Sequence, residues 1–281
     1  MLVLTVLIFC LLRSVAGLPC QLVELHIDVE SGESFTDLNC LEENGKAFAI
    51  RGDRTDELKG NFRKQMAGDG DAINGVFIDV NKEDFDERRA ELVIRSDRKI
   101  RYEKRAVRSR SRPPRKLLRG RGLAQANGIS SVLAVKSKGN DSPVVSSSVG
   151  VLSESVFGGP NDAVNLKSQM NDCSHGKLQM TMAQGTNIPV GGVAEATVDI
   201  PSYHANSGTF QNLVLDALTT QGINYGTFDH VMICVPPNMY YFDSTSSFIA
   251  YGYINSWLTV YSDKWCTYVS AGKPSLSTST D

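Results

Sequence analysis

Residues 248–271 read "FIAYGYINSWLTVYSDKWCTYVSA", a stretch dense in aromatic and β-branched residues. This composition favours strands that pack against a core. At Gly272 the character changes, and a polar tail of Ser, Thr, Lys and Pro runs to Asp281. The stretch therefore predicts the strand-rich end of a folded domain. Residues 272–281 are predicted to be unstructured, because they offer little to bury.

The segment before this stretch carries both strand and helix patterns. Apolar or alternating runs predict strands at 130–137, 178–183, 194–201 and 228–237. Helices are predicted at about 161–172, after Pro160, and at 207–222, where Ser207 starts the helix and Gly222 ends it. The second helix has an apolar stripe formed by Phe210, Leu213, Val214, Ala217 and Leu218. Residues 130–271 are therefore predicted to form an α/β domain.

Residues 18–97 form an acidic segment with β character. "VELHIDVE" (23–30) alternates apolar and polar residues, as a strand with one buried face does. Asn74-Gly75 is a turn signal ahead of an apolar run, and "AELVIRSD" (90–97) predicts a further strand. We expect a small antiparallel barrel or sandwich here, so the fold class of the whole chain is α+β.

A basic connector, residues 98–122, separates the two acidic segments. Residues 98–121 hold 12 Lys and Arg against one acid, whereas residues 18–97 hold 19 acids and 10 bases. In an exported chain this predicts a processing linker for a basic-specific protease, because Pro113-Pro114 disfavours helix and Arg occupies several positions. Candidate cuts follow Arg105, Arg115, Arg119 and Arg121. The alternatives are a solvated linker and a nucleic-acid patch, and a signal peptide argues against the latter.

The first 17 residues have the pattern of a secretory signal peptide. The apolar run from Leu2 to Leu12 is shorter than the roughly 20 residues of a membrane span. Cleavage is expected between Gly17 and Leu18, after a small-residue site. The alternatives are a short membrane anchor and a buried helix. The mature chain is therefore expected to be secreted, with no membrane association once the signal is removed.

Removal of the signal peptide leaves an odd number of cysteines. All five are disulfide candidates: Cys20, Cys40, Cys173, Cys234 and Cys266. One of them is expected to lack a partner. Asn140 heads the sequon Asn140-Asp141-Ser142 and is the candidate glycosylation site.

Catalytic motifs are missing from the sequence. The four histidines, at positions 26, 175, 204 and 230, include no pair at i,i+4 that would hold one metal. His175 and His230 are each a candidate metal ligand, but a polar group at the end of a strand or helix is the simpler interpretation of both. The chain contains no Gly-x-Ser-x-Gly and no glycine-rich phosphate loop. No catalytic or metal-ligating residue is assigned.

Three stretches carry a resemblance to a known family: "DAVNLKSQMNDCSHGKLQM" (162–180), "DHVMICVPP" (229–237) and residues 248–271. Together they resemble the gametolysin family of secreted zinc metallopeptidases, within the metzincin group. The resemblance covers residues 130–271 and implies a signal, a pro-segment and a catalytic domain. It also implies a zinc cofactor, a substrate in extracellular or cell-wall glycoprotein, and an edge strand for substrate at "FIAYGYINSW".

The resemblance also implies what this chain lacks. In the family, "CTYVSA" leads into a helix with His-Glu-x-x-His, whose histidines bind Zn²⁺ and whose Glu is the general base. Here Gly272-Lys273 follows, and residues 272–281 contain no His or Glu. We therefore expect no zinc and no cleavage by this chain as written. A retained intron or truncated gene model after Ala271 is the favoured explanation, and a genuine short relative is the other.

Two further expectations stay open. Latency in the wider group can use a pro-segment thiolate, for which Cys20 and Cys40 are candidates, although a disulfide is the preferred reading for both. The alternative function is a secreted, non-catalytic binding protein whose aromatic C-terminal stretch contacts carbohydrate or a protein partner.

Overall fold

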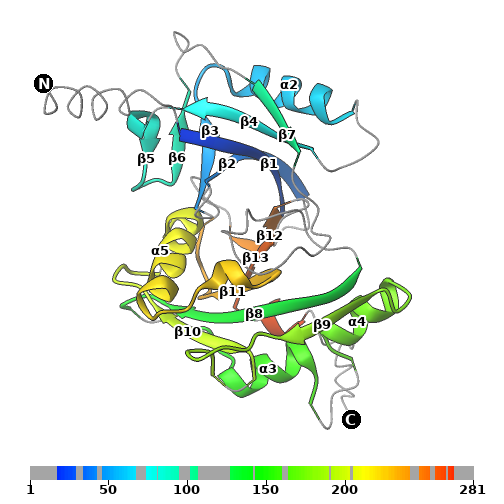
Figure 1. The fold of residues 1–281 in the computed structure, drawn as a ribbon. Helices are drawn as coiled ribbons and strands as arrows, with labels where there is room; N and C mark the ends of the chain where they lie inside the picture. The colour runs from blue at the N-terminus through cyan, green and yellow to red at the C-terminus, as the bar shows by residue number, and fades with distance from the viewer. Residues whose placement is uncertain are drawn as a thin grey trace, which may run out of the picture.

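The structure is a computed structural model of the chain, shown in Figure 1. It describes residues 18–29, 34–42, 46–67, 74–80, 82–94, 102–106, 127–141, 143–159, 164–189, 191–202, 205–240, 247–253, 257–263 and 265–268. We call residues 18–106 the N-terminal half and residues 128–268 the C-terminal half. A single mixed sheet runs through both halves.

The described residues of the N-terminal half contain seven strands, one α-helix and one short 3-10 helix. In chain order they are β1 (Leu18–Val29), β2 (Ser34–Leu41), β3 (Ala47–Arg51), α2 (Thr55–Ala67), β4 (Asn74–Val80), η2 (Lys82–Asp84), β5 (Phe85–Asp86), β6 (Glu91–Val93) and β7 (Tyr102–Ala106).

The C-terminal half contains six strands and four α-helices among its described residues. In chain order they are β8 (Gly128–Lys138), α3 (Val149–Phe157), α4 (Leu166–Cys173), β9 (Leu178–Met182), β10 (Val193–Thr197), α5 (Ser207–Thr220), η3 (Tyr225–Thr227), β11 (His230–Val235), β12 (Phe248–Tyr253), β13 (Leu258–Ser262) and α6 (Trp265–Tyr268).

The strand order is β10-β8-β11-β13-β12-β1-β2-β3-β6-β5, with β9 also on β8 and β4 joining β1 to β7. In the C-terminal half β10, β8, β11 and β13 are parallel. Strand β12 is antiparallel to β13 and also to β1, the first strand of the N-terminal half. The β1–β12 pair is therefore the junction at which the two halves form one sheet.

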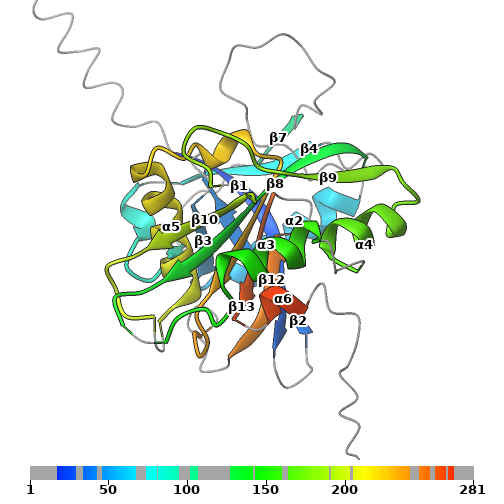
Figure 2. The same ribbon diagram turned by 90° about the horizontal axis from the view of Figure 1, so that it is seen from below.

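The sheet is strongly bent, so that the two halves face each other (Figure 1). The inner face holds one apolar cluster with contributions from β1, β8, β11, β12 and α5. Helix α2 covers the outer face of the N-terminal half, where Leu58 and Phe62 pack beside the strands. Helices α3, α4 and α6 lie on the outer face of the C-terminal half (Figure 2).

Burial on both faces explains the sequence of β8. Leu133 and Val135 belong to the inner cluster, and Val132 and Ala134 belong to the outer cluster with α3. A strand covered on both sides reads as a continuous apolar run, as parallel strands usually do.

The predicted α+β class is confirmed at this level: the chain has one large mixed sheet with helices on both faces. The predicted strands of residues 18–97 are present, but they do not close into a separate barrel, because β1 continues the sheet through β12. Helix α5 follows its predicted bounds, with Asn206 as N-cap and Gly222, at φ 74°, just past its end. The helix expected from 161 begins at Leu166, because Asn165 and Ser168 form a capping box there.

Candidate functional site: the covered strand β12

Strand β12 is the strand that the resemblance assigns to substrate. On one side it pairs with β13, through Ala250–Tyr261, Tyr251–Val260 and Gly252–Thr259. On its other side it pairs with β1 from Leu25–Tyr253 to Val29–Phe248. Its backbone edge is therefore occupied by a segment of the same chain that lies more than 200 residues away in sequence.

The inner face of β12 is aromatic and buried. Phe248, Tyr251 and Tyr253 are 0%, 2% and 4% exposed. The ring centroids of Phe248 and Tyr251 are 5.1 Å apart, and those of Tyr251 and Tyr253 are 6.3 Å apart. These rings cover the inner face of β12, so the inward side chains of a strand that pairs with β12 lie next to them.

Gln211 of α5 holds the two tyrosines in place. The hydroxyls of Tyr251 and Tyr253 donate to its Oε1 at 3.1 and 3.2 Å. Burial raises the pKa of both phenols well above the ordinary value, so each stays protonated and can donate. Gln211 is itself fully buried, which makes this a polar contact inside the core.

Strand β1 presents two different faces over β12. Leu25 and Ile27, opposite Tyr253 and Tyr251, are both 0% exposed and belong to the inner cluster. The alternate residues His26 and Asp28 face outward, where His26 Nε2 lies 3.3 Å from Asp28 Oδ1. An extended segment with aliphatic residues at every second position is thus what β12 accepts.

Helix α5 adds polar contacts from the C-terminal half to the N-terminal half. The Asn212 amide accepts from the Ala47 N–H at 3.1 Å and donates to the Ala47 carbonyl at 3.0 Å. Thr209 Oγ1 donates to the Arg88 carbonyl at 2.8 Å. Asn212 therefore takes the place of a strand partner for Ala47, which lies outside the part of β3 that pairs with β6, Ala49 to Arg51.

An ion pair extends this contact beside Asn212. Lys46 Nζ lies 2.8 Å from Asp216 Oδ2. Burial opposes the charged form of Lys46, but the hydrogen bond and the charge of Asp216 outweigh it and raise the pKa of the lysine. The ammonium stays charged at neutral pH and holds β3 against α5.

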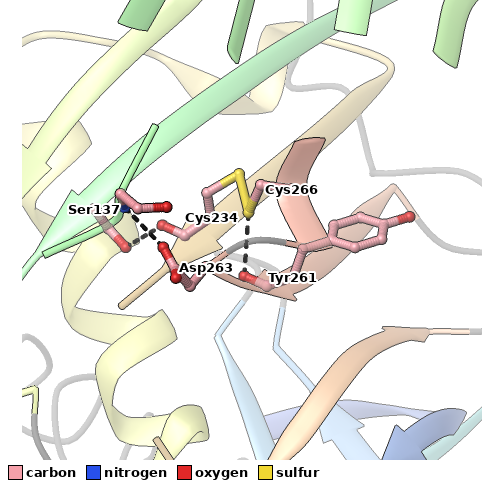
Figure 3. Close-up of a disulfide and its surroundings, with 6 residues drawn as sticks. Ser137, Cys234, Tyr261, Asp263 and Cys266 are labelled. Atoms are coloured by element: carbon pink, nitrogen blue, oxygen red, sulfur yellow. Dashed lines mark hydrogen bonds between the residues drawn. A yellow bond between two sulfur atoms is a disulfide. The ribbon is translucent and has the colours of Figure 1, made fainter. Parts of the chain in front are cut away.

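A disulfide fixes the C-terminal end of β11 to α6 (Figure 3). It joins Cys234 of β11 to Cys266 of α6. Asp263 leads into this helix: its N–H donates to the Val235 carbonyl at 2.8 Å, and its Oδ1 accepts from the Ser146 N–H at 2.7 Å. Ser137 Oγ donates to the Cys234 carbonyl at 2.6 Å, which ties β8 to the same point. The first turn of α6 is thereby anchored to the central strands.

The described residues do not fit a zinc site. No group of three His, Cys, Asp or Glu side chains lies close enough to hold a metal ion in this part of the chain. His26 is exposed on β1 and His175 is exposed in a turn at φ 53°. His230 lies within β11, its Nε2 3.0 Å from Thr259 Oγ1, and burial lowers its pKa to about 4. His204 lies outside the described residues.

Four of the five described cysteines form two disulfides. Cys20 pairs with Cys40 across β1 and β2, and Cys234 pairs with Cys266. Cys173 at the end of α4 is the free, exposed thiol. In this state neither Cys20 nor Cys40 is a free thiolate.

The remaining predicted sites lie away from β12. Arg105 is within β7, where it pairs with Gly75 of β4, while Arg115, Arg119 and Arg121 lie outside the described residues. Gly17 also lies outside them, and Leu18 begins β1. Asn140 is exposed, and its Nδ2 donates to Asp199 Oδ1 at 3.1 Å.

Sequence reasoning missed the polar residues of α5. Gln211 and Asn212 interrupt the apolar stripe of the helix and are buried. Their partners lie on strands that are far away in sequence, so no local pattern connects them. A pair of amides inside an otherwise buried helix is the signal that was available.

Comparisons of the whole chain with protein-family models, with curated proteins and with solved structures find no match. In the described part of the chain, none of the helices has the length and apolar character that a membrane span requires.

Proposed function

We propose that this chain is the pro-form of a secreted zinc-dependent endopeptidase of the gametolysin family, with β12 as its substrate strand, and that it is inactive as given because residues 272–281 contain no His or Glu for the zinc-binding helix. In this proposal the C-terminal half binds the peptide, and the N-terminal half is the pro-segment. The substrate is extracellular or cell-wall glycoprotein. A basic-specific protease cuts the connector.

The observation that carries the proposal is the pairing of β1 with β12. Extended peptides bind proteins by adding a strand to a sheet edge, with alternate side chains entering pockets. Here β1 occupies that edge in antiparallel register, and Leu25 and Ile27 fill the apolar face. A pro-segment that lies along the peptide-binding strand keeps the strand from substrate.

Two further features support the proposal. The disulfides Cys20–Cys40 and Cys234–Cys266 are typical of proteins that fold in an oxidising compartment. A helix begins at Trp265, at the place from which the resemblance continues into an active-site helix. The residues of this chain supply peptide binding and latency, and we derive no catalytic step from them.

The first experiment is to sequence the mature transcript across the codons for Ser270 to Pro274. A transcript that continues from Ala271 into His-Glu-x-x-His supports the proposal. Its secreted product should contain about one zinc per chain and cleave a protein substrate after the N-terminal half is removed. The variant with Gln in place of the motif's Glu is the control, since it keeps the histidines.

If every transcript keeps Gly272-Lys273 and stops after Asp281, the peptidase function is wrong for this chain. The alternative is then the secreted, non-catalytic binding protein. In that case a carbohydrate or protein partner could reach Tyr251 and Tyr253 only after β1 leaves β12, because both rings are buried.

A further inference from the structure

We infer that cutting the connector does not release the N-terminal half, which stays bound as the non-covalent partner of the C-terminal half. The mature molecule is then a two-chain complex, and uncovering β12 takes a second event after the cut. This inference rests on contacts between the halves and does not depend on the proposed peptidase function.

The first reason is that the two halves share one apolar core. The inner cluster contains seven buried residues of the N-terminal half, packed with residues of β8, β11, β12, β13 and α5. They are Val23, Leu25, Ile27, Leu41, Ala47, Ala49 and Ala90. Loss of the N-terminal half would expose Phe248, Tyr251 and Tyr253 together, an apolar patch that soluble chains rarely leave open.

The second reason is the backbone pairing at the junction. Strands β1 and β12 pair over the five residues from Leu25 to Val29. Without β1, the hydrogen-bonding edge of β12 would be left bare, and bare apolar edges lead to aggregation. The N-terminal half thus protects the surface that it covers.

The third reason is the polar contact set of α5. Asn212 satisfies both backbone groups of Ala47, and Lys46 pairs with Asp216. Asn212 is 7% exposed, so separation must expose and solvate an amide that is now fully paired. Because these polar contacts are directional, they hold the two halves in one relative position, which apolar packing alone would not do.

Within the described parts of the two halves, no disulfide joins one half to the other. Cys20–Cys40 lies within the N-terminal half and Cys234–Cys266 within the C-terminal half. After a cut in the connector the association is therefore non-covalent, and a denaturing gel can distinguish it from a covalent one.

The experiment places a site-specific protease sequence after Arg121 in the full chain and cuts the folded protein. We expect two fragments on a non-reducing denaturing gel and a single co-eluting peak in native gel filtration. Separate elution of a monodisperse C-terminal fragment would overturn the inference. Co-elution only as large aggregates would overturn it as well.

Interface variants make the test quantitative. Asn212→Ala should raise the dissociation constant of the cut protein about tenfold or more, because it leaves the two Ala47 backbone groups unpaired. Thr220→Ala is the matched control on the same helix, since Thr220 bonds only locally, to the Asp216 carbonyl, and is exposed. Equal dissociation constants for the two variants would count against α5 as part of the interface.

Discussion

Gln211 and Asn212 are neighbours on α5, yet they bind different parts of the fold. Gln211 accepts from two tyrosines of β12, whereas Asn212 pairs with the backbone of β3. Two adjacent amides thus place the aromatic strand and the N-terminal half against the same helix. Asn212 bonds Ala47 through both its oxygen and its nitrogen, whereas Gln211 is bonded through Oε1 and its buried Nε2 has no partner among the described residues. Apolar replacement at either position leaves buried polar groups of other elements without a bond that they now make.

Replacing Gln211 by Leu tests the first of these contacts. The change leaves the buried Tyr253 hydroxyl without its Gln211 acceptor and leaves Tyr251 with the longer bond to the Ser207 carbonyl at 3.4 Å. We therefore expect a loss of about 2 kcal/mol in the free energy of unfolding. Urea denaturation of the full chain measures it, with Thr220→Ala as the control. A Gln211→Leu protein as stable as the wild type would show that the tyrosines do not depend on this amide.

His230 predicts a pH dependence of stability. Burial lowers its pKa to about 4 in the folded chain, below the ordinary value of 6.5. As the pH falls, His230 takes up a proton in the unfolded chain before it does so in the folded chain, and this favours unfolding. The contribution of neutral His230 to the free energy of unfolding is therefore full above about pH 6.5 and is lost as the pH falls toward 4.

Between pH 7 and pH 4.5, we expect the free energy of unfolding to fall by about 1–2 kcal/mol more in the wild type than in His230→Gln. Urea unfolding at both pH values gives the comparison. Gln keeps a polar group near Thr259 but does not titrate in this range. Both proteins have the same carboxylates, so the effect of the carboxylates on stability cancels in the difference between them. Parallel losses in the two proteins would mean that His230 is already solvated in the folded state.

At the level of elements, period-two and helical patterns located most of the sheet and helix α5. Helix α2 was missed, because Leu58 and Phe62 are the only buried residues in the range 55–64, where burial is described, and most of the other residues there are polar. Helix α3 was missed as well, since it has only nine residues between loop-like segments. The partners of β1 could not be predicted either. Strand pairing depends on which edges meet in space, and β1 and β12 are at opposite ends of the chain.

The register of β1 on β12 is open to a direct test. Asp28 and Ala250 are partners in the pairing, so Asp28→Cys with Ala250→Cys places two thiols at a distance that a disulfide spans. In the protein cut after Arg121, the oxidised double variant should run as one covalently joined species that reduction separates.

The control for this cross-link combines His26→Cys with Ala250→Cys, which is offset by two residues along β1. It should cross-link several-fold less under the same oxidant. Equal yields from the two pairs would indicate a register that slides, and a stronger yield from the control would contradict the pairing described here.

On the scale of the whole molecule, the distribution of charge predicted separate folded units, whereas the structure has one core shared by both halves. An acidic, a basic and an acidic segment follow one another in sequence, which predicts separate units. The apolar faces of the two acidic segments instead meet in one core. Composition reports on solvent-facing side chains, whereas the division into units is decided by which apolar faces are left to cover each other.

The Cys20–Cys40 disulfide should matter for the whole molecule. The bond joins β1 to β2 and closes a loop over a sequence separation of 20 residues. Cys20→Ser with Cys40→Ser should therefore lower the free energy of unfolding by about 3 kcal/mol. Guanidinium denaturation measures it. Cys173→Ser, which removes the exposed free thiol, should change stability by no more than about 0.5 kcal/mol.

The pairing of β1 with β12 also means that β1 is synthesised well before its partner strand. Leu25 and Ile27 leave the ribosome roughly 220 residues before their partners on β12. At about 5–20 residues per second, that interval lasts roughly 10–45 s. During that interval the apolar face of β1 has no partner strand to pack with. We therefore expect chaperones in the compartment where the chain folds to bind nascent β1.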